Sequence, residues 1–224
     1  MQRRLLSLTS ATFLACFLLS GSALAQPIFD PSGLHWTETT YDFQPLDPAA
    51  GGSLTGTAIS FSGATGSDIG EEDVTLPWAF PWYGQSYQTA SVGVDGLISF
   101  EAGGNLGSSN GPLPRTGQYE RMDIAVFWDD LSVSPNGTGA VYYATDATNN
   151  RFIISWEGIQ RDGAPSPGSF QLHLYPDGSF SMHWADTDFG SPGIYDFGDS
   201  ATVGVQDWAG NTHSSGYYLQ VSNN

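Results

Sequence analysis

Six aspartates are the residues whose type and spacing could hold a hard cation. They are Asp129, Asp130, Asp186, Asp188, Asp196 and Asp199. Ca²⁺ takes about six to eight oxygen ligands, and two carboxylates in an Asp-x-Asp spacing can reach one ion. Aspartates are also common where a strand ends or a loop turns, because their side chains accept hydrogen bonds from nearby backbone N–H groups. The sequence therefore allows a site for Ca²⁺, the one cofactor we consider, and leaves ordinary turn chemistry as the alternative.

Three aromatic residues form a second candidate site, for a ligand rather than an ion. Trp78, Trp82 and Tyr83 stand close together beside Pro77 and Pro81. Exposed aromatic rings can stack on sugar rings or on proline-rich peptides. Buried, the same residues would fill a corner of the core, and the sequence leaves both interpretations open.

A catalytic set is not evident, and we expect none. The serines lie mostly in linkers, and the chain has a single cysteine. A glycosidase needs two carboxylates that face one cleft. Asp129, Asp130, Glu157 and Asp207 lie on or beside expected strands, but no pair among them stands out. A carboxylate-based glycan hydrolase therefore remains only an alternative.

The clearest structural element is a hairpin over Ser169–Ala185. Apolar and polar residues alternate on both sides of Pro176-Asp177-Gly178, which predicts a three-residue loop with Gly178 in a left-handed conformation. Counting outward from this loop predicts the opposite pairs Leu174 with Phe180, Leu172 with Met182, and Phe170 with Trp184. The same register makes His173 and His183 diagonal neighbours on the polar face, where we expect surface histidines rather than a zinc site.

Short runs of this kind recur along the chain, separated by Gly, Pro, Asn and Asp. The further strands that we expect are 36–42, 57–62, 91–94, 97–101, 123–128, 139–144, 151–157, 201–207 and 217–221. Long loops rich in Gly, Ser, Pro or Asp are expected at 63–73, 103–117 and 187–200. We therefore predict an all-β fold, a single-domain antiparallel β-sandwich with long loops.

The first 25 residues have the pattern of a secretory signal peptide. Arg3 and Arg4 precede an apolar run, and Ala23-Leu24-Ala25 supplies small residues for cleavage. A membrane anchor and lipidation at Cys16 are the alternatives. Cleavage after Ala25 leaves a domain of residues 26–224 without cysteine and therefore without a disulfide. The expected location is outside the cytoplasm, extracellular or periplasmic.

The charge balance excludes two classes of partner. The chain has 6 Lys+Arg against 23 Asp+Glu, a formal charge of −17. Loss of Arg3 and Arg4 with the signal peptide leaves 4 minus 23, or −19. Nucleic-acid binding needs clustered basic residues, and anionic membranes attract them. We therefore expect no nucleic-acid partner and no adsorption on anionic membranes. We also expect no membrane insertion after cleavage, because no second long apolar run follows the first.

Several stretches, taken in order, resemble the NIDO-like module named after nidogen. They are Val74–Gly84, Val92–Phe100, Ile124–Leu131, Val141–Tyr143, Arg151–Trp156, Phe170–Phe180 and Ala201–Val205. The resemblance covers about Thr55–Asp207. It implies an all-β extracellular module for interaction or adhesion, without an established catalytic constellation.

These observations together predict a secreted, non-catalytic module that binds an extracellular protein or glycan, with calcium as an optional organiser of its loops. A structural matrix or surface component that self-associates through a sheet edge is the alternative. The oligomeric state is left open by the sequence.

Overall fold

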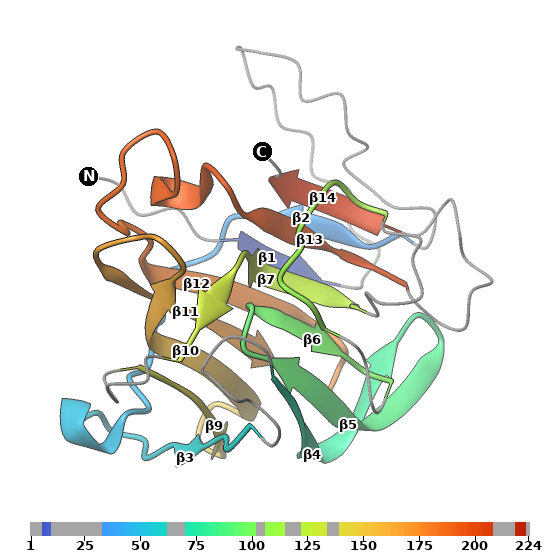
Figure 1. The fold of residues 1–224 in the computed structure, drawn as a ribbon. Helices are drawn as coiled ribbons and strands as arrows, with labels where there is room; N and C mark the ends of the chain where they lie inside the picture. The colour runs from blue at the N-terminus through green and yellow to red at the C-terminus, as the bar shows by residue number, and fades with distance from the viewer. Residues whose placement is uncertain are drawn as a thin grey trace.

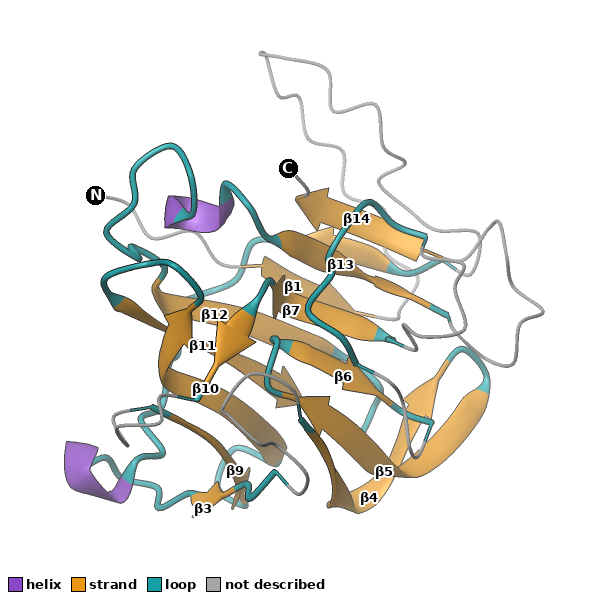
Figure 2. Ribbon diagram, in the orientation of Figure 1, coloured by secondary structure: helices purple, strands orange, loops and turns teal. Residues whose placement is uncertain are grey.

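A computed structural model describes residues 6–9, 33–61, 70–101, 106–114, 122–133, 139–207 and 218–222, the first of these by its backbone. Two antiparallel sheets pack face to face as a β-sandwich (Figure 1), which confirms the predicted all-β class. In the described ranges the helical pieces are two 3-10 turns (Figure 2), Pro48–Ala50 (η1) and Asp196–Gly198 (η2). No helix in those ranges is long and apolar enough to cross a membrane.

The larger sheet has the strand order β2-β1-β12-β11-β10-β9-β3, and β8 pairs with β10 outside this path. Its strands are β1 (Leu6–Thr9), β2 (His35–Thr37), β3 (Thr57–Ala58), β8 (Leu131–Ser132), β9 (Ala140–Asp146), β10 (Arg151–Arg161), β11 (Pro167–Leu174) and β12 (Phe180–Asp186). The four strands β9 to β12 follow one another in sequence and in space. Short turns join them, so this part of the sheet is an antiparallel meander.

The smaller sheet has the order β14-β13-β7-β6-β5-β4. Its strands are β4 (Glu71–Trp82), β5 (Gln85–Gly93), β6 (Leu97–Ser99), β7 (Ile124–Trp128), β13 (Thr202–Gln206) and β14 (Tyr218–Ser222). Every residue of β7 is buried, as expected for a continuous apolar strand covered on both faces. One cover is the core between the sheets, and the other is a cluster that includes Leu106 and Leu113.

The register of the β11–β12 hairpin agrees with the sequence-based prediction at every predicted pair. Leu174 lies opposite Phe180, Leu172 opposite Met182 and Phe170 opposite Trp184. Gly178 has φ +85, and its N–H donates to the carbonyl of Tyr175 at 3.0 Å. A residue with a side chain is strained in this conformation, so glycine fixes the loop and the loop fixes the register.

The N-terminal strands are shorter than predicted. In place of a strand over 36–42, β2 ends at Thr37, and residues 39–47 continue as an extended segment that we call the strap. β3 holds only Thr57–Ala58 instead of 57–62. In contrast, β4 was not predicted, because Pro77 and Pro81 interrupt its alternating pattern. The sheet accommodates them because β4 is an edge strand with a register shift between Thr75 and Phe80.

The main core lies between the two sheets and contains several stacked aromatic rings among its aliphatic residues. Trp156 stacks on Phe170 with ring centroids 5.1 Å apart, and Phe80 on Phe100 at 4.9 Å. Trp156 is fully buried in this core, and Trp128 is fully buried in the second cluster, with Leu106 and Leu113. Trp184 is only partly buried and donates its indole N–H to the carbonyl of Val126. Each fully buried Phe contributes about 2–3 kcal/mol, so these rings hold the sheets together.

Candidate functional site

The predicted aromatic platform is not gathered on the surface. Trp82 is only 4% exposed, its ring centroid is 5.3 Å from that of Phe100, and its Nε1 donates to Asp123 Oδ1 at 2.9 Å. Trp78 and Tyr83 are half-buried against the same core. Trp82 is therefore a core residue, whereas ligand binding by Trp78 and Tyr83 stays a prediction.

Asp129 and Asp130 form the turn at the end of β7. Asp129 is buried, and its Oδ1 accepts from the backbone N–H of Asp130 at 2.8 Å and from Arg161 Nη2 at 3.2 Å. Its Oδ2 accepts from the Ser200 hydroxyl. This is the turn chemistry that the sequence left open, here with an ion pair added.

The four aspartates of the loop after β12 also serve the loop itself. Asp186 accepts from the N–H of Asp188 at 3.0 Å, Asp188 accepts from Gly190 at 3.0 Å, and the buried Asp196 accepts from Ser191 at 2.8 Å. Asp199 caps η2 through its own N–H. Among the described residues, no three His, Cys, Asp or Glu side chains are arranged to hold a metal ion. The described contacts leave the sequence-based prediction of calcium binding untested, and they favour its alternative, ordinary turn chemistry.

We expect millimolar Ca²⁺ and EDTA to give the same melting temperature. The reason is that the oxygens of Asp129, Asp186, Asp188 and Asp196 already accept hydrogen bonds from their own turns. Differential scanning calorimetry in the two buffers measures this directly. A rise of several degrees with Ca²⁺, absent with Mg²⁺, would mean that some of these carboxylates do share an ion.

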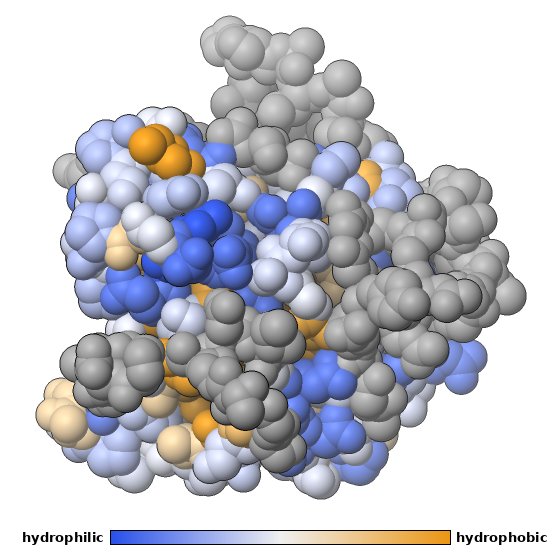
Figure 3. Space-filling view, in the orientation of Figure 1, coloured by the Kyte–Doolittle hydropathy of each residue, from blue (hydrophilic) through white to orange (hydrophobic). Residues whose placement is uncertain are grey.

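The same loop carries two large apolar side chains that are exposed. In the described ranges, the large apolar residues that are exposed are Ile194, at 57%, and Phe197, at 61%. We call residues 187–200 the apolar loop. Figure 3 shows a hydrophobic patch in this region with hydrophilic residues around it. Asp186, Asp188 and Asp199 are exposed on the same stretch of chain, and we call these three carboxylates the acidic surround.

Several contacts fix the shape of the apolar loop. Phe197 has φ +58, a left-handed conformation that costs a non-glycine residue about 1–3 kcal/mol. Its N–H donates to the carbonyl of Thr187 at 2.7 Å. The ring of Tyr195 lies 3.8 Å from the guanidinium carbon of Arg161, which also pairs with Asp129. The loop thus presents Ile194 and Phe197 from a backbone that is hydrogen-bonded and locally strained.

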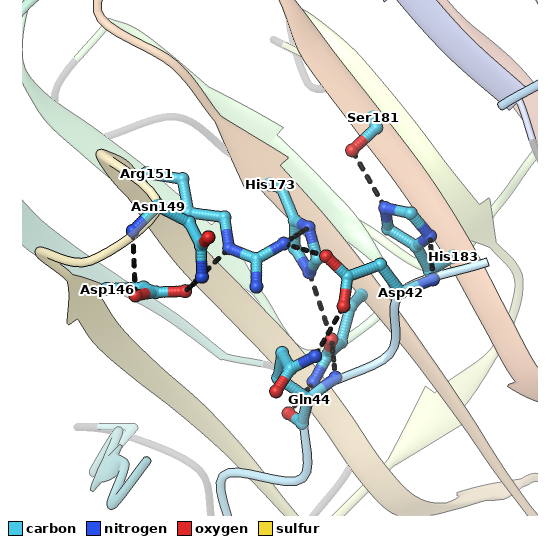
Figure 4. A network of polar contacts seen from close by, with 9 residues as sticks. Asp42, Gln44, Asp146, Asn149, Arg151, His173, Ser181 and His183 are labelled. Carbon is cyan, nitrogen blue, oxygen red and sulfur yellow. Dashed lines mark hydrogen bonds and ion pairs between the residues drawn. The ribbon is translucent and has the colours of Figure 1, made fainter. Parts of the chain in front are cut away.

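A buried polar network lies on the other face of the larger sheet, beneath the strap (Figure 4). Alternate N–H groups of the strap donate to side chains of successive strands. Asp42 donates to His183 on β12 at 3.3 Å, Gln44 to Gln171 on β11 at 2.9 Å, and Leu46 to Glu157 on β10 at 2.7 Å. The strap therefore crosses the sheet as an extended chain whose partners are side chains instead of another backbone.

The two histidines of this network are buried, so the prediction of surface histidines was wrong. Their ring centroids are 4.3 Å apart. His173 Nδ1 lies 3.1 Å from Arg151 Nη1, and since arginine only donates, this nitrogen is the acceptor. His183 Nδ1 accepts from Asp42, which leaves its Nε2–H to donate to Ser181 at 2.8 Å. Because these ring nitrogens are engaged in hydrogen bonds, the two histidines serve to anchor the strap to the sheet and do not form a zinc site.

Burial and charge keep both histidines neutral. Burial lowers the pKa of His183 to about 4; the Arg151 charge adds to this and Asp42 opposes it. Burial, His183 and Arg151 lower the pKa of His173 well below its usual value. Burial raises the pKa of Asp42, but hydrogen bonds from Arg151 and Gln44 outweigh it and the net direction is down. The network therefore holds one cation, Arg151, between carboxylates and neutral rings.

The carboxylates considered for catalysis have structural contacts. Glu157 accepts from the N–H of Leu46, from Asp47 at 3.2 Å and from the Ser155 hydroxyl at 2.6 Å, while Asp129 pairs with Arg161. Residues 107–111 are Gly-Ser-Ser-Asn-Gly, which matches the sequence pattern of a nucleophile elbow. Such an elbow joins a strand to a helix, whereas the described residues 107–114 form bends and irregular loop. These contacts give no support to a hydrolase.

A pocket of about 470 Å³ opens beside the strap. It is lined by three hydroxyl side chains, two tyrosines, a carboxylate and a histidine: Thr39, Thr40, Ser181, Tyr41, Tyr175, Asp42 and His183. Hydroxyls and a carboxylate next to aromatic rings are groups that could contact a sugar.

Comparison with known proteins identifies a family. The sequence model of a protein family described as NIDO related matches residues 35–224. A search of curated proteins and a search of solved structures gave no match. The family match spans both sheets from β2 onward, the strap and the apolar loop.

Proposed function

The chain belongs to the NIDO-related family, and from this premise we propose that it is a secreted, non-catalytic module that binds an extracellular partner protein through its apolar loop. Family membership supports an extracellular module. The predicted signal peptide, Met1–Ala25, supports export. The observation that carries the proposal is the display of Ile194 and Phe197 on a fixed, strained backbone.

The apolar loop has the chemistry of a binding centre. Exposed apolar residues with a polar surround are typical of protein interaction sites, and a few large side chains usually supply most of the affinity. Fixing the loop before binding reduces the entropy that is lost on association. Burying Ile194 and Phe197 is worth about 1.5–3 kcal/mol each. The acidic surround and the overall charge favour a partner whose apolar pocket has a neutral or basic rim.

A protein partner suits this loop better than a glycan. Sugars are usually bound by aromatic faces together with several hydrogen-bonding groups, whereas the loop offers one aliphatic side chain and one phenyl ring. The pocket beside the strap is the specific observation that favours a glycan, and it lies on a different part of the fold. Self-association, the third function considered, is opposed by repulsion between copies that each carry a charge of about −19.

An array of purified extracellular matrix proteins and glycans tests the proposal. We expect the wild-type protein to bind protein spots, and the double variant Ile194→Ser/Phe197→Ser to bind them at least about tenfold more weakly, since about 1.4 kcal/mol is a factor of ten. The matched control is Thr75→Ser/Ala79→Ser on β4, where both side chains are exposed and far from the loop in sequence. The control should bind as the wild type does.

Three results would contradict the proposal. Binding confined to glycan spots would favour the pocket beside the strap as the binding site. Equal binding by wild type and double variant would exclude the apolar loop as the binding site. Concentration-dependent assembly of the purified protein in sedimentation, without binding to the array, would favour the structural alternative. Equal melting temperatures of the variants establish that a loss of binding is not a loss of fold.

A further inference from the structure

β1 fills the space between two strands of the larger sheet. It pairs antiparallel with β12, with Leu6 opposite Met182, Ser7 opposite Ser181 and Leu8 opposite Phe180. Its other edge pairs antiparallel with β2. β1 therefore bridges β12 and β2, which have no other strand between them in the sheet order.

The whole of β1 lies within Met1–Ala25, the segment that is expected to leave on export. The buried apolar residues whose side chains are described run from Leu34 to Leu219, outside that segment, so the processed protein keeps all of them. Cleavage removes the partner of one edge of β12 and the strand that pairs with β2. Unpaired strand edges readily accept another strand.

We propose that in the exported protein the gap between β12 and β2 receives an extended segment of a partner protein, which adds to the sheet in the place of β1. This inference rests on the export that the proposed function includes. Backbone pairing on both sides supplies affinity, as in other cases of strand addition, and alternate side chains supply selectivity.

The burial of β12 defines the chemistry of the inserted segment. Phe180 and Met182 are fully buried on the core side of the sheet, and Ser181 lies on the opposite side, next to His183. Directly opposite residues of an antiparallel pair share a face. The segment therefore carries apolar residues at alternate positions, with a small polar residue between them, a pattern that Leu-Ser-Leu satisfies.

A different protein is a better donor than a second copy of this chain. The other described strands of the processed chain already have partners in the two sheets. Two processed copies, each with 4 basic and 23 acidic residues, also repel each other. A segment of low or positive charge avoids this repulsion.

The test uses the protein purified after export, with its N-terminus confirmed by mass spectrometry, and a fluorescent peptide of residues 4–11. Fluorescence anisotropy should show saturable binding to the processed protein and at least about tenfold weaker binding to the full-length chain, where β1 occupies the gap. Two control peptides, Leu6→Asp/Leu8→Asp and Ser7→Pro, should bind at least about tenfold more weakly, since one removes the apolar positions and the other a backbone donor.

Hydrogen exchange locates the binding. The peptide should slow exchange of the β12 amides, residues 180–186, in the processed protein. The proposal is overturned if the peptide does not bind, if the control peptides bind equally well, if β12 is equally protected in both forms without peptide, or if the exported protein still begins at Met1. The variant Ile194→Ser/Phe197→Ser should bind the peptide as the wild type does, which separates failure of this inference from failure of the apolar loop.

Discussion

Replacing Arg151 by methionine is expected to lower the free energy of unfolding by about 3–5 kcal/mol. Arg151 Nε donates to Asp146 Oδ2 at 2.9 Å, and its Nη1 pairs with Asp42. Asp146 is only 5% exposed, so the variant leaves a buried carboxylate without its cation. Urea denaturation at neutral pH measures the loss, and methionine keeps most of the side-chain volume.

A second variant separates the lost charge from lost packing. In Arg151→Met/Asp146→Asn a neutral amide replaces the buried carboxylate. Asn149 Nδ2, which now donates to Asp146 Oδ2 at 2.7 Å, can still donate to the amide oxygen of residue 146. We expect this double variant to be more stable than Arg151→Met alone, with a coupling of about 1–3 kcal/mol. A loss below about 1 kcal/mol in the single variant would contradict the role given to Arg151.

Acid should weaken the protein as the pH falls from 6.5 towards 4, because the fold keeps His183 neutral. The pKa of His183 falls from 6.5 to about 4 on folding, so below pH 6.5 the unfolded chain binds a proton that the folded chain does not. Above pH 6.5 His183 is neutral in both states and costs the folded protein nothing. As the pH falls from 6.5 to about 4, protonation of the unfolded chain progressively lowers the free energy of unfolding. A difference of about 2.5 pKa units is worth about 3 kcal/mol. His173 acts in the same direction.

The variant His183→Gln provides the control for this pH dependence. Glutamine can still accept from the N–H of Asp42 and donate to Ser181, but it does not titrate. The difference in free energy of unfolding between wild type and variant should shift by about 1.4 kcal/mol per pH unit between pH 6 and pH 4.5, in the direction of a less stable wild type at acid pH. A difference that does not change with pH would show that His183 is not held neutral by the fold.

The sequence predicts what depends on neighbouring residues in the chain. The register of β11 and β12 follows from alternation and one glycine turn, and it correctly places His173 opposite Ser181. The burial of His173 was missed because alternation tells which face a residue is on and not what covers that face. The cover is the strap, and Gln44 is 127 residues from its partner Gln171. No local pattern reports such a contact.

The candidate sites follow the same distinction. The sequence drew attention to the apolar loop through its aspartates, whose side chains accept hydrogen bonds from backbone N–H groups of the loop. The residues that the proposal uses, Ile194 and Phe197, are in the same loop and were overlooked. A signal was available: they are large apolar residues among Gly, Pro and Asp, outside any alternating run. The strain at Phe197, by contrast, depends on the folded loop and its bond to Thr187.

The most direct test of the apolar loop is a hydrogen-exchange footprint of the complex with the strongest protein partner found on the array. The account predicts that exchange slows over residues 187–200 and stays unchanged over β4. Protection over β4 and the turn at Tyr83, with no change in the loop, would contradict it and return the binding site to the half-buried aromatic residues Trp78 and Tyr83.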